Sequence, residues 1–317
     1  MLTIIKGWDI PKEEFIEAEK NKRLCTISID LTEECYLNCE GCFTRIQRKN
    51  IPKISLEEKL CLIDEAADLG AKTVNIVGAG EPLLDPNFEE IIERINQNGM
   101  YAVVFTSGYY GYKSDLLQNP LRFREKKVSF VFKLWGRIES VEDSLVQKKG
   151  YSKERNKNLR ILLSHAFNKG EQIYLDDRQY KLTRMGADIL VRRRNYPEIQ
   201  NIFEYCRNNE IMPILVPYIP GTLESEFNFE EWKIICAKIG SIDQKFQNRK
   251  YEDLFYPQAT KCPQSIAGLY VNNNGEIRSC VGTTKVYGIY KPGKNMLHQA
   301  LKTRIEKVSF GCVPRGL

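Results

Sequence analysis

The chain has 317 residues, of which 42% are hydrophobic, and its formal net charge is +6. A chain of this size can bury a sizeable core, it has no apolar run long enough to span a bilayer, and its charged start lacks the core of a signal peptide. We therefore expect a cytoplasmic protein, in which clustered cysteines bind metal rather than form disulfides. Only two histidines are present, which argues against a histidine-based zinc enzyme.

Apolar and β-branched runs alternate with amphipathic runs through residues 23–227. Six strands are predicted, at residues 24–30, 73–77, 102–106, 128–133, 188–192 and 212–216. Helices are predicted between them, at residues 55–70, 88–98, 158–167 and 197–206. Such alternation is typical of parallel βα units. We predict an α/β fold, a partial (β/α)6 TIM-like barrel, with a doubly wound parallel sheet as the alternative.

Three cysteines follow the first predicted strand at the spacing C-x3-C-x2-C, namely Cys35, Cys39 and Cys42. Three thiolates in one short loop can surround a soft-metal centre, and thiolates select zinc, copper(I) or iron–sulfur clusters. Three ligands leave a metal position open, whereas a structural zinc site normally has four. The alternatives are a zinc knuckle with a distant fourth ligand, or buried structural thiols.

This spacing resembles the cluster loop of the radical S-adenosylmethionine (SAM) superfamily. The resemblance implies that Cys35, Cys39 and Cys42 hold a [4Fe–4S] cluster whose fourth iron chelates the amino and carboxylate groups of SAM. It implies that SAM is cleaved reductively to a 5′-deoxyadenosyl radical, which abstracts hydrogen from a substrate. It also implies the partial barrel. One departure is Gly41, since the family often has an aromatic residue or histidine at that position.

A second motif ends the next predicted strand. Residues 78–82 read Gly-Ala-Gly-Glu-Pro and resemble the Gly-Gly-Glu-Pro motif of the same family, with Ala79 in place of one glycine. Gly78 and Gly80 would let a ligand approach the backbone closely. The resemblance assigns Glu81 to the amino group of SAM, and a carboxylate can accept hydrogen bonds from an ammonium group. The alternative is an ordinary turn after a strand.

Polar side chains also end the later strands, where ligands of such folds bind. Thr106 and Ser107 end the third strand, Lys133 ends the fourth, and Arg192 ends the fifth. By position they could contact the ribose and carboxylate of SAM. Arg192 is favoured among the neighbouring arginines because it shares a strand face with Leu190. Each could equally be a solvated polar residue at a strand end.

The last part of the chain combines a hairpin signal with further cysteines. Asn274-Gly275 separates two short apolar-bearing segments, a strong hairpin signal, and it lies between Cys262 and Cys280, with Cys312 near the end. This segment resembles the twitch or SPASM segment of some radical SAM enzymes and implies a second, auxiliary [4Fe–4S] cluster. Unrelated buried thiols are the alternative.

The predicted organisation is a lead-in at residues 1–22, partly helical, a radical SAM core at residues 23–227, and a cysteine-bearing β-hairpin extension at residues 228–317. The implied function is oxidation or bond formation on a small molecule or a ribosomal peptide, with a flavodoxin- or ferredoxin-type reductant as partner. No membrane contact is expected, and no catalytic residue is assigned. The alternatives are a radical SAM enzyme that modifies RNA, a non-catalytic iron–sulfur electron carrier and a zinc-bound nucleic-acid module, although no basic tail or nucleic-acid motif is present.

Overall fold

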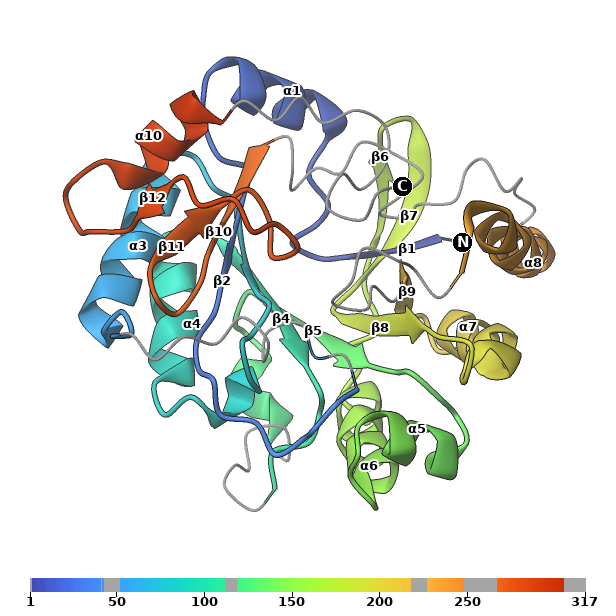
Figure 1. The fold of residues 1–317 in the computed structure, drawn as a ribbon. Coiled ribbons are helices and arrows are strands. Elements are labelled where there is room, and N and C mark those ends of the chain that lie inside the picture. Colours follow the sequence, from blue (N-terminus) through green and yellow to red (C-terminus); the bar gives the residue numbers. More distant parts are fainter. Residues whose placement is uncertain are drawn as a thin grey trace.

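The computed structural model describes residues 2–40, 42, 52–111, 119–217, 227–247 and 267–304. Its main feature is one curved nine-stranded sheet (Figure 1). The strands are β2 (Thr26–Ile29), β3 (Thr73–Ile76), β4 (Tyr101–Thr106), β5 (Val128–Lys133), β8 (Met185–Val191), β9 (Met212–Pro217), β10 (Gly268–Val271), β11 (Glu276–Arg278) and β12 (Gly288–Ile289). Their order is β12-β11-β10-β2-β3-β4-β5-β8-β9.

The six strands from β2 to β9 are all parallel and are the six that the sequence predicts. Helices follow them on the outer side of the curve (Figure 1), so the partial (β/α)6 TIM-like barrel is confirmed. The helices are α1 (Lys12–Lys20), α3 (Leu56–Asp68), α4 (Phe88–Gln97), α5 (Glu139–Leu145), α6 (Tyr151–Ser164), α7 (Ile199–Asn208), α8 (Phe229–Gln247) and α10 (Met296–Thr303). Short 3-10 turns are η1 (Pro82–Leu84), η2 (Pro120–Phe123) and η3 (Tyr196–Glu198).

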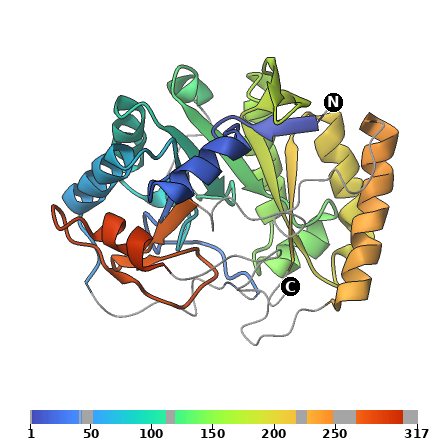
Figure 2. The same cartoon turned by 90° about the horizontal axis from the view of Figure 1, so that it is seen from above.

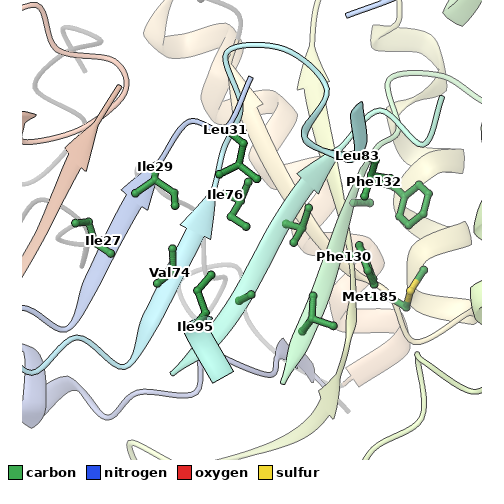
Figure 3. Close-up of a cluster of buried hydrophobic side chains, with 14 of the residues drawn as sticks. Ile27, Ile29, Leu31, Val74, Ile76, Leu83, Ile95, Phe130, Phe132 and Met185 are labelled. Carbon is green, nitrogen blue, oxygen red and sulfur yellow. The ribbon is translucent and has the colours of Figure 1, made fainter. Parts of the chain in front are cut away.

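The core lies between the sheet and the outer helices. Successive side chains of a strand point to opposite faces, so every second residue of the parallel strands faces the helices and is fully buried. Figure 3 shows members of this outer cluster from three strands: Ile27, Ile29, Val74, Ile76, Phe130 and Phe132. The intervening residues face the inside of the barrel, where Val103 and Val131 belong to a second, smaller cluster.

The N-terminal lead-in corrects the prediction, because it is more than a polar, partly helical stretch. It begins with β1 (Leu2–Ile5), which is buried throughout and pairs in parallel with β7 (Arg178–Thr183). β7 in turn pairs with β6 (Gln172–Leu175), forming a separate three-stranded sheet, and Figures 1 and 2 show β1 beside this hairpin. A four-residue strand whose partner lies far along the chain leaves no recognisable period in the sequence.

The segment after β1 is hydrogen-bonded to the inner face of the barrel. Trp8 Nε1 donates to Asn75 Oδ1 at 2.8 Å, and Ser129 Oγ donates to the carbonyl of Lys6 at 2.8 Å.

Two helices also differ from the sequence prediction. α5 was not predicted, and α6 begins at Tyr151, seven residues before the predicted start at residue 158.

The predicted C-terminal hairpin is present and extends the barrel sheet. β10 and β11 are antiparallel around Gly275, whose φ of +77° suits glycine, and β10 pairs in parallel with β2. The sequence predicts a helix at residues 230–239 and a connection from there to residue 261, but α8 continues to Gln247, and residues 248–261 lie outside the described residues. None of the helices in the described part of the chain is both long and apolar enough to cross a membrane.

Candidate active site

The cysteine loop follows β2 at the carboxyl end of the barrel and lies along the end of α5. The amide of Asn38 donates to the carbonyl of Val146 at 3.1 Å, and the amide of Glu40 donates to the carbonyl of Leu145 at 2.9 Å. Between these anchors, Cys39 is held in place. Cys35 and Cys39 pack against an apolar cluster of buried side chains: Leu37, Trp135, Leu145, Val146 and Tyr151.

A cation stands beside these sulfurs. Lys133 Nζ lies 3.2 Å from Cys39 Sγ and 4.2 Å from the centre of the Trp135 ring. Burial raises the pKa of the Cys35 thiol, while the Leu37 amide and Lys133 oppose the rise. Burial alone would lower the pKa of Lys133, but the Cys39 and Cys35 sulfurs raise it above the usual lysine value. The two sulfurs next to Lys133 therefore favour the protonated ammonium at this position.

The donor set fits an iron–sulfur cluster in its chemistry. Cysteine thiolates are the normal ligands of such clusters, and Cys35, Cys39 and Cys42 lie on one short loop, where the amide of Cys42 donates to the carbonyl of Cys39 at 3.3 Å. Among the described residues, no three His, Cys, Asp or Glu side chains are gathered closely enough to hold a metal ion. Cys35 and Cys39, which share the apolar cluster, are the two that the structure brings together.

The glycine-rich turn after β3 packs directly on the cysteine loop. A Cβ on Gly80 would stand 2.1 Å from the carbonyl oxygen of Glu34, which is backbone and cannot turn aside. The amide of Glu81 donates to the same carbonyl at 2.7 Å. Gly78 has a φ of +78°, which side-chain-bearing residues rarely adopt. Gly80 is therefore required by backbone packing between the two motifs, and Gly78 by the backbone conformation of the turn itself.

Glu81 joins the turn to the end of β4. Its Oε1 accepts from Thr106 Oγ1 at 2.6 Å and from the Leu83 amide at 3.3 Å. Its Oε2 accepts from the amide and hydroxyl of Ser107 at 2.7 and 2.5 Å. Burial raises the pKa of Glu81, and the Ser107 and Thr106 donors lower it in part. Three residues that the sequence predicts as separate SAM contacts thus bind one another, a partnership that no motif encodes.

Arg192 follows β8 and reaches the cysteine loop. Its guanidinium donates to Glu40 Oε2 at 2.7 Å, and Arg194 approaches Glu40 Oε1 at 3.5 Å. The Arg192 amide donates to Asn195 Oδ1 at 2.7 Å, which fixes the turn that carries it. The structure thus places Arg192 at the site, paired with a loop carboxylate between two of the cysteines.

A buried ion pair between α5 and α6 holds the end of β5 next to the cysteine loop. Arg155 of α6 and Glu142 of α5 are paired and each side chain is 1% exposed. Arg155 also donates to the carbonyl of Lys133 at 2.6 Å, and Glu142 accepts from the Trp135 amide at 2.9 Å. The pair therefore positions α5, the platform of the cysteine loop, against the end of β5. Neither residue lies in a predicted helix, so nothing in the sequence pattern indicated that the two are paired.

Asp30, the last residue before the loop begins, is a second functional candidate that the sequence reasoning missed. It is 2% exposed, and its Oδ2 accepts from the Tyr270 hydroxyl of β10 at 2.7 Å. Its Oδ1 has no hydrogen-bond partner within the described part of the chain. Burial raises the pKa of Asp30 to about 7, while Tyr270, the Asn273 amide and Arg278 lower it in part and Glu33 adds to the rise.

The predicted auxiliary ligands are only partly within the described residues. Cys280 follows β11 and is partly buried, and the amide of Gly282 donates to its sulfur at 3.2 Å. Cys262 and Cys312 lie outside the described residues, so the predicted three-cysteine group stays a prediction.

These observations define a class: a parallel βα barrel with a thiolate loop and a glycine-rich turn at its carboxyl end. Residues 29–121 match the family model described as the Radical SAM superfamily. The chain therefore carries a radical SAM domain, as the resemblance of its cysteine loop implies. Such a domain works with a [4Fe–4S] cluster and SAM, which agrees with the chemistry of the donor set.

Proteins related by sequence are similar to this chain either over a short stretch or over a long stretch at lower identity. An S-adenosylmethionine-dependent nucleotide dehydratase from Flammeovirga pacifica is 31% identical over 104 residues, which is 31% of this chain and 36% of the relative. A GTP 3′,8-cyclase from Aquifex aeolicus is 22% identical over 262 residues, 80% of this chain and 73% of that protein. The match to the first of these spans about a third of the relative's length.

Solved structures share the fold over nearly the whole chain. Streptococcus suis SuiB bound to S-adenosylmethionine has a TM-score of 0.64 at 11% identity, covering 96% of this chain and 68% of SuiB. The enzyme anSMEcpe with bound AdoMet has a TM-score of 0.62 at 12% identity, covering 86% of this chain and 79% of that structure. Because the sequence identities are this low, these similarities establish the fold alone.

Proposed function

We propose that this radical SAM protein is an enzyme that cleaves SAM reductively and uses the resulting radical to abstract hydrogen from a substrate. The observation that carries the proposal is the contact between the two motifs: the carbonyl of Glu34, next to Cys35, accepts from the amide of Glu81 and lies against Gly80. When bound, the cluster supplies the electron that splits SAM into methionine and a 5′-deoxyadenosyl radical.

The described residues divide the binding work among themselves. Cys35, Cys39 and Cys42 would hold the cluster, and the apolar cluster around Leu37 would keep water from it. The glycine-rich turn would receive the methionine part of SAM, while Glu81 braces that turn against Ser107. Both oxygens of Glu81 already accept hydrogen bonds from protein donors. If Glu81 contacts the amino group of SAM, we expect one of these oxygens to accept from both partners.

The substrate is proposed to be a peptide, with a small molecule such as a nucleotide as the second candidate. One solved structure similar in fold is SuiB bound to the precursor peptide SuiA, with a TM-score of 0.65. The nucleotide candidate is supported by the two sequence relatives, whose names specify a nucleotide dehydratase and a GTP cyclase. A non-catalytic electron carrier would not require the glycine-rich turn, which makes it the weaker alternative.

Anaerobic reconstitution with iron and sulfide, followed by incubation with SAM and dithionite, tests the activity. We expect 5′-deoxyadenosine from the wild type and none from Cys39→Ala. Cys61→Ala is the matched control, because Cys61 is exposed on α3 and away from the loop. Deoxyadenosine formation by Cys39→Ala at the wild-type rate, or zinc without sulfide in the purified protein, would refute the proposal.

The auxiliary cluster is proposed separately, on Cys262, Cys280 and Cys312. Replacing all three by alanine is expected to remove about half of the iron of a protein with two [4Fe–4S] clusters, while SAM cleavage continues. Iron content equal to that of the wild type would mean that the segment binds no cluster. A flavodoxin- or ferredoxin-type protein is the proposed physiological reductant.

A further inference from the structure

Lys133 ends β5 on the inner face of the barrel, two residues after Val131 of the inner cluster. From the sequence it is a candidate contact of SAM. In the structure its ammonium group is directed at the cysteine loop instead, with Nζ 3.2 Å from Cys39 Sγ. The Trp135 ring lies 4.2 Å from the same nitrogen and limits where the ammonium can move.

The surroundings make this contact electrostatically strong. Cys39 packs against a cluster of buried apolar side chains that includes Leu37 and Trp135, and the lysine ammonium lies over the Trp135 ring of the same cluster. In such a medium a charge is screened less than in water, and a hydrogen bond from a charged donor is stronger. The one carboxylate that the pairing of β5 with β8 sets opposite Lys133 is Asp188, whose Oδ2 accepts from Trp135 Nε1 at 3.4 Å.

We propose that Lys133 is a positioning and tuning residue that raises the reduction potential of the cluster by an N–H···S hydrogen bond to Cys39. Reduction adds a negative charge to the cluster, so a nearby cation stabilises the reduced form more than the oxidised form. Hydrogen bonds to cluster sulfurs are among the features that set iron–sulfur potentials. The inference rests on the proposed function, since it requires that Cys39 be a cluster ligand.

The test is a potentiometric titration of the reconstituted protein without SAM, followed by electron paramagnetic resonance of the reduced cluster. Lys133→Met removes the charge and the donor while keeping the length of the side chain. We expect its midpoint to become more negative, with about a tenfold loss in the reduction equilibrium, which is 59 mV for one electron. Lys133→Gln, which keeps a neutral donor, should fall between this variant and the wild type.

The matched control is Lys148→Met. Lys148 follows α5 and its Nζ lies 5.8 Å from the centre of the Tyr109 ring, so the variant removes a nearby lysine charge that makes no hydrogen bond to a cysteine in the described part of the chain. Its midpoint should equal that of the wild type. Titration of each variant with SAM separates the two roles of Lys133: an unchanged midpoint with weaker SAM binding would make it a SAM ligand and refute the proposal.

Three further outcomes would also refute the proposed role of Lys133 or the function on which it rests. Equal midpoints and equal SAM affinities in all variants would leave Lys133 with packing alone, against the proposal. If neither Lys133→Met nor Lys133→Gln takes up iron, the lysine is needed to assemble the site and the tuning role is wrong. A wild-type protein that binds no cluster would refute the proposed function itself, and this is recognised before any variant is measured.

Discussion

Two buried carboxylates border the start of the cysteine loop, and they differ in how many hydrogen bonds they accept. Glu81, after β3, accepts four hydrogen bonds from Thr106, Ser107 and Leu83. Asp30, after β2, accepts one, from Tyr270, and its other oxygen has no partner within the described residues. Both are about 2% exposed. Burial alone therefore does not decide the role of an acid; the number of donors around it does.

Replacing the two acids by their amides should change the free energy of unfolding in opposite directions, and the larger change is expected at Asp30. Asp30→Asn should stabilise the protein above pH 7. An aspartate has a pKa near 3.9 when unfolded and about 7 here, so the stability contributed by its protonated form is complete below about pH 4 and is lost as the pH rises through 7. The full difference corresponds to about 4 kcal/mol.

Urea unfolding of the wild type and Asp30→Asn at several pH values from 5 to 8 checks this expectation. The advantage of the variant should grow with pH and level off above 7. A constant difference across the series would show that Asp30 does not titrate in this range.

Glu81→Gln should act in the opposite direction and destabilise the protein. In either orientation the new NH2 group would face a backbone amide, that of Ser107 or that of Leu83, which can only donate. A hydrogen bond to a charged group is worth about 1.5–3 kcal/mol, and we expect a loss of that size in urea unfolding at pH 7. Glu139→Gln, at an exposed position of α5, is the control. Equal stability of Glu81→Gln and the wild type would contradict the bracing role.

Gly80→Ala tests the contact between the motifs. The added Cβ would overlap the carbonyl oxygen of Glu34 at 2.1 Å, and overpacking of this kind costs about 1–3 kcal/mol. Because that carbonyl precedes Cys35, iron uptake on reconstitution should fall as well. Gly99→Ala is the control, since no atom lies within 4 Å of its Cβ and it carries only the strain of a positive φ. Normal iron uptake by Gly80→Ala would mean that the cysteine loop shifts without consequence.

Tyr270→Phe should have the smallest effect, about 0.5–1.5 kcal/mol for one hydrogen bond. The Tyr270 hydroxyl lowers the pKa of Asp30, so its removal should move the pH transition in stability to higher pH. The same unfolding series, run on this variant, measures the shift. A transition at the wild-type pH would indicate that the phenol does not interact with the titrating carboxyl.

The sequence predicts the fold where a pattern is local. β5 has the predicted bounds, and α3 lies within the predicted helix at residues 55–70, where Ser55 and Glu58 form a capping box at its start. β1 was missed because its stability comes from pairing with the distant β7, and the β6–β7 hairpin was missed because its largely exposed strands show no clear apolar alternation. In the site, motifs located the cysteines, Gly80 and Glu81, but they carry no information on partners. The four bonds to Glu81, and the single bond to Asp30 from a strand 240 residues away, depend on tertiary placement.

The parallel pairing of β10 with β2 has a consequence for biogenesis. During synthesis β2 leaves the ribosome long before β10, and until β10 arrives one edge of β2 is unpaired, next to the cysteine loop. Contacts between such distant segments form slowly, and open strand edges invite association with other chains. The nascent protein thus passes through a stage in which its cysteine loop is already made while the neighbouring strand is missing, so the loop is exposed during that interval.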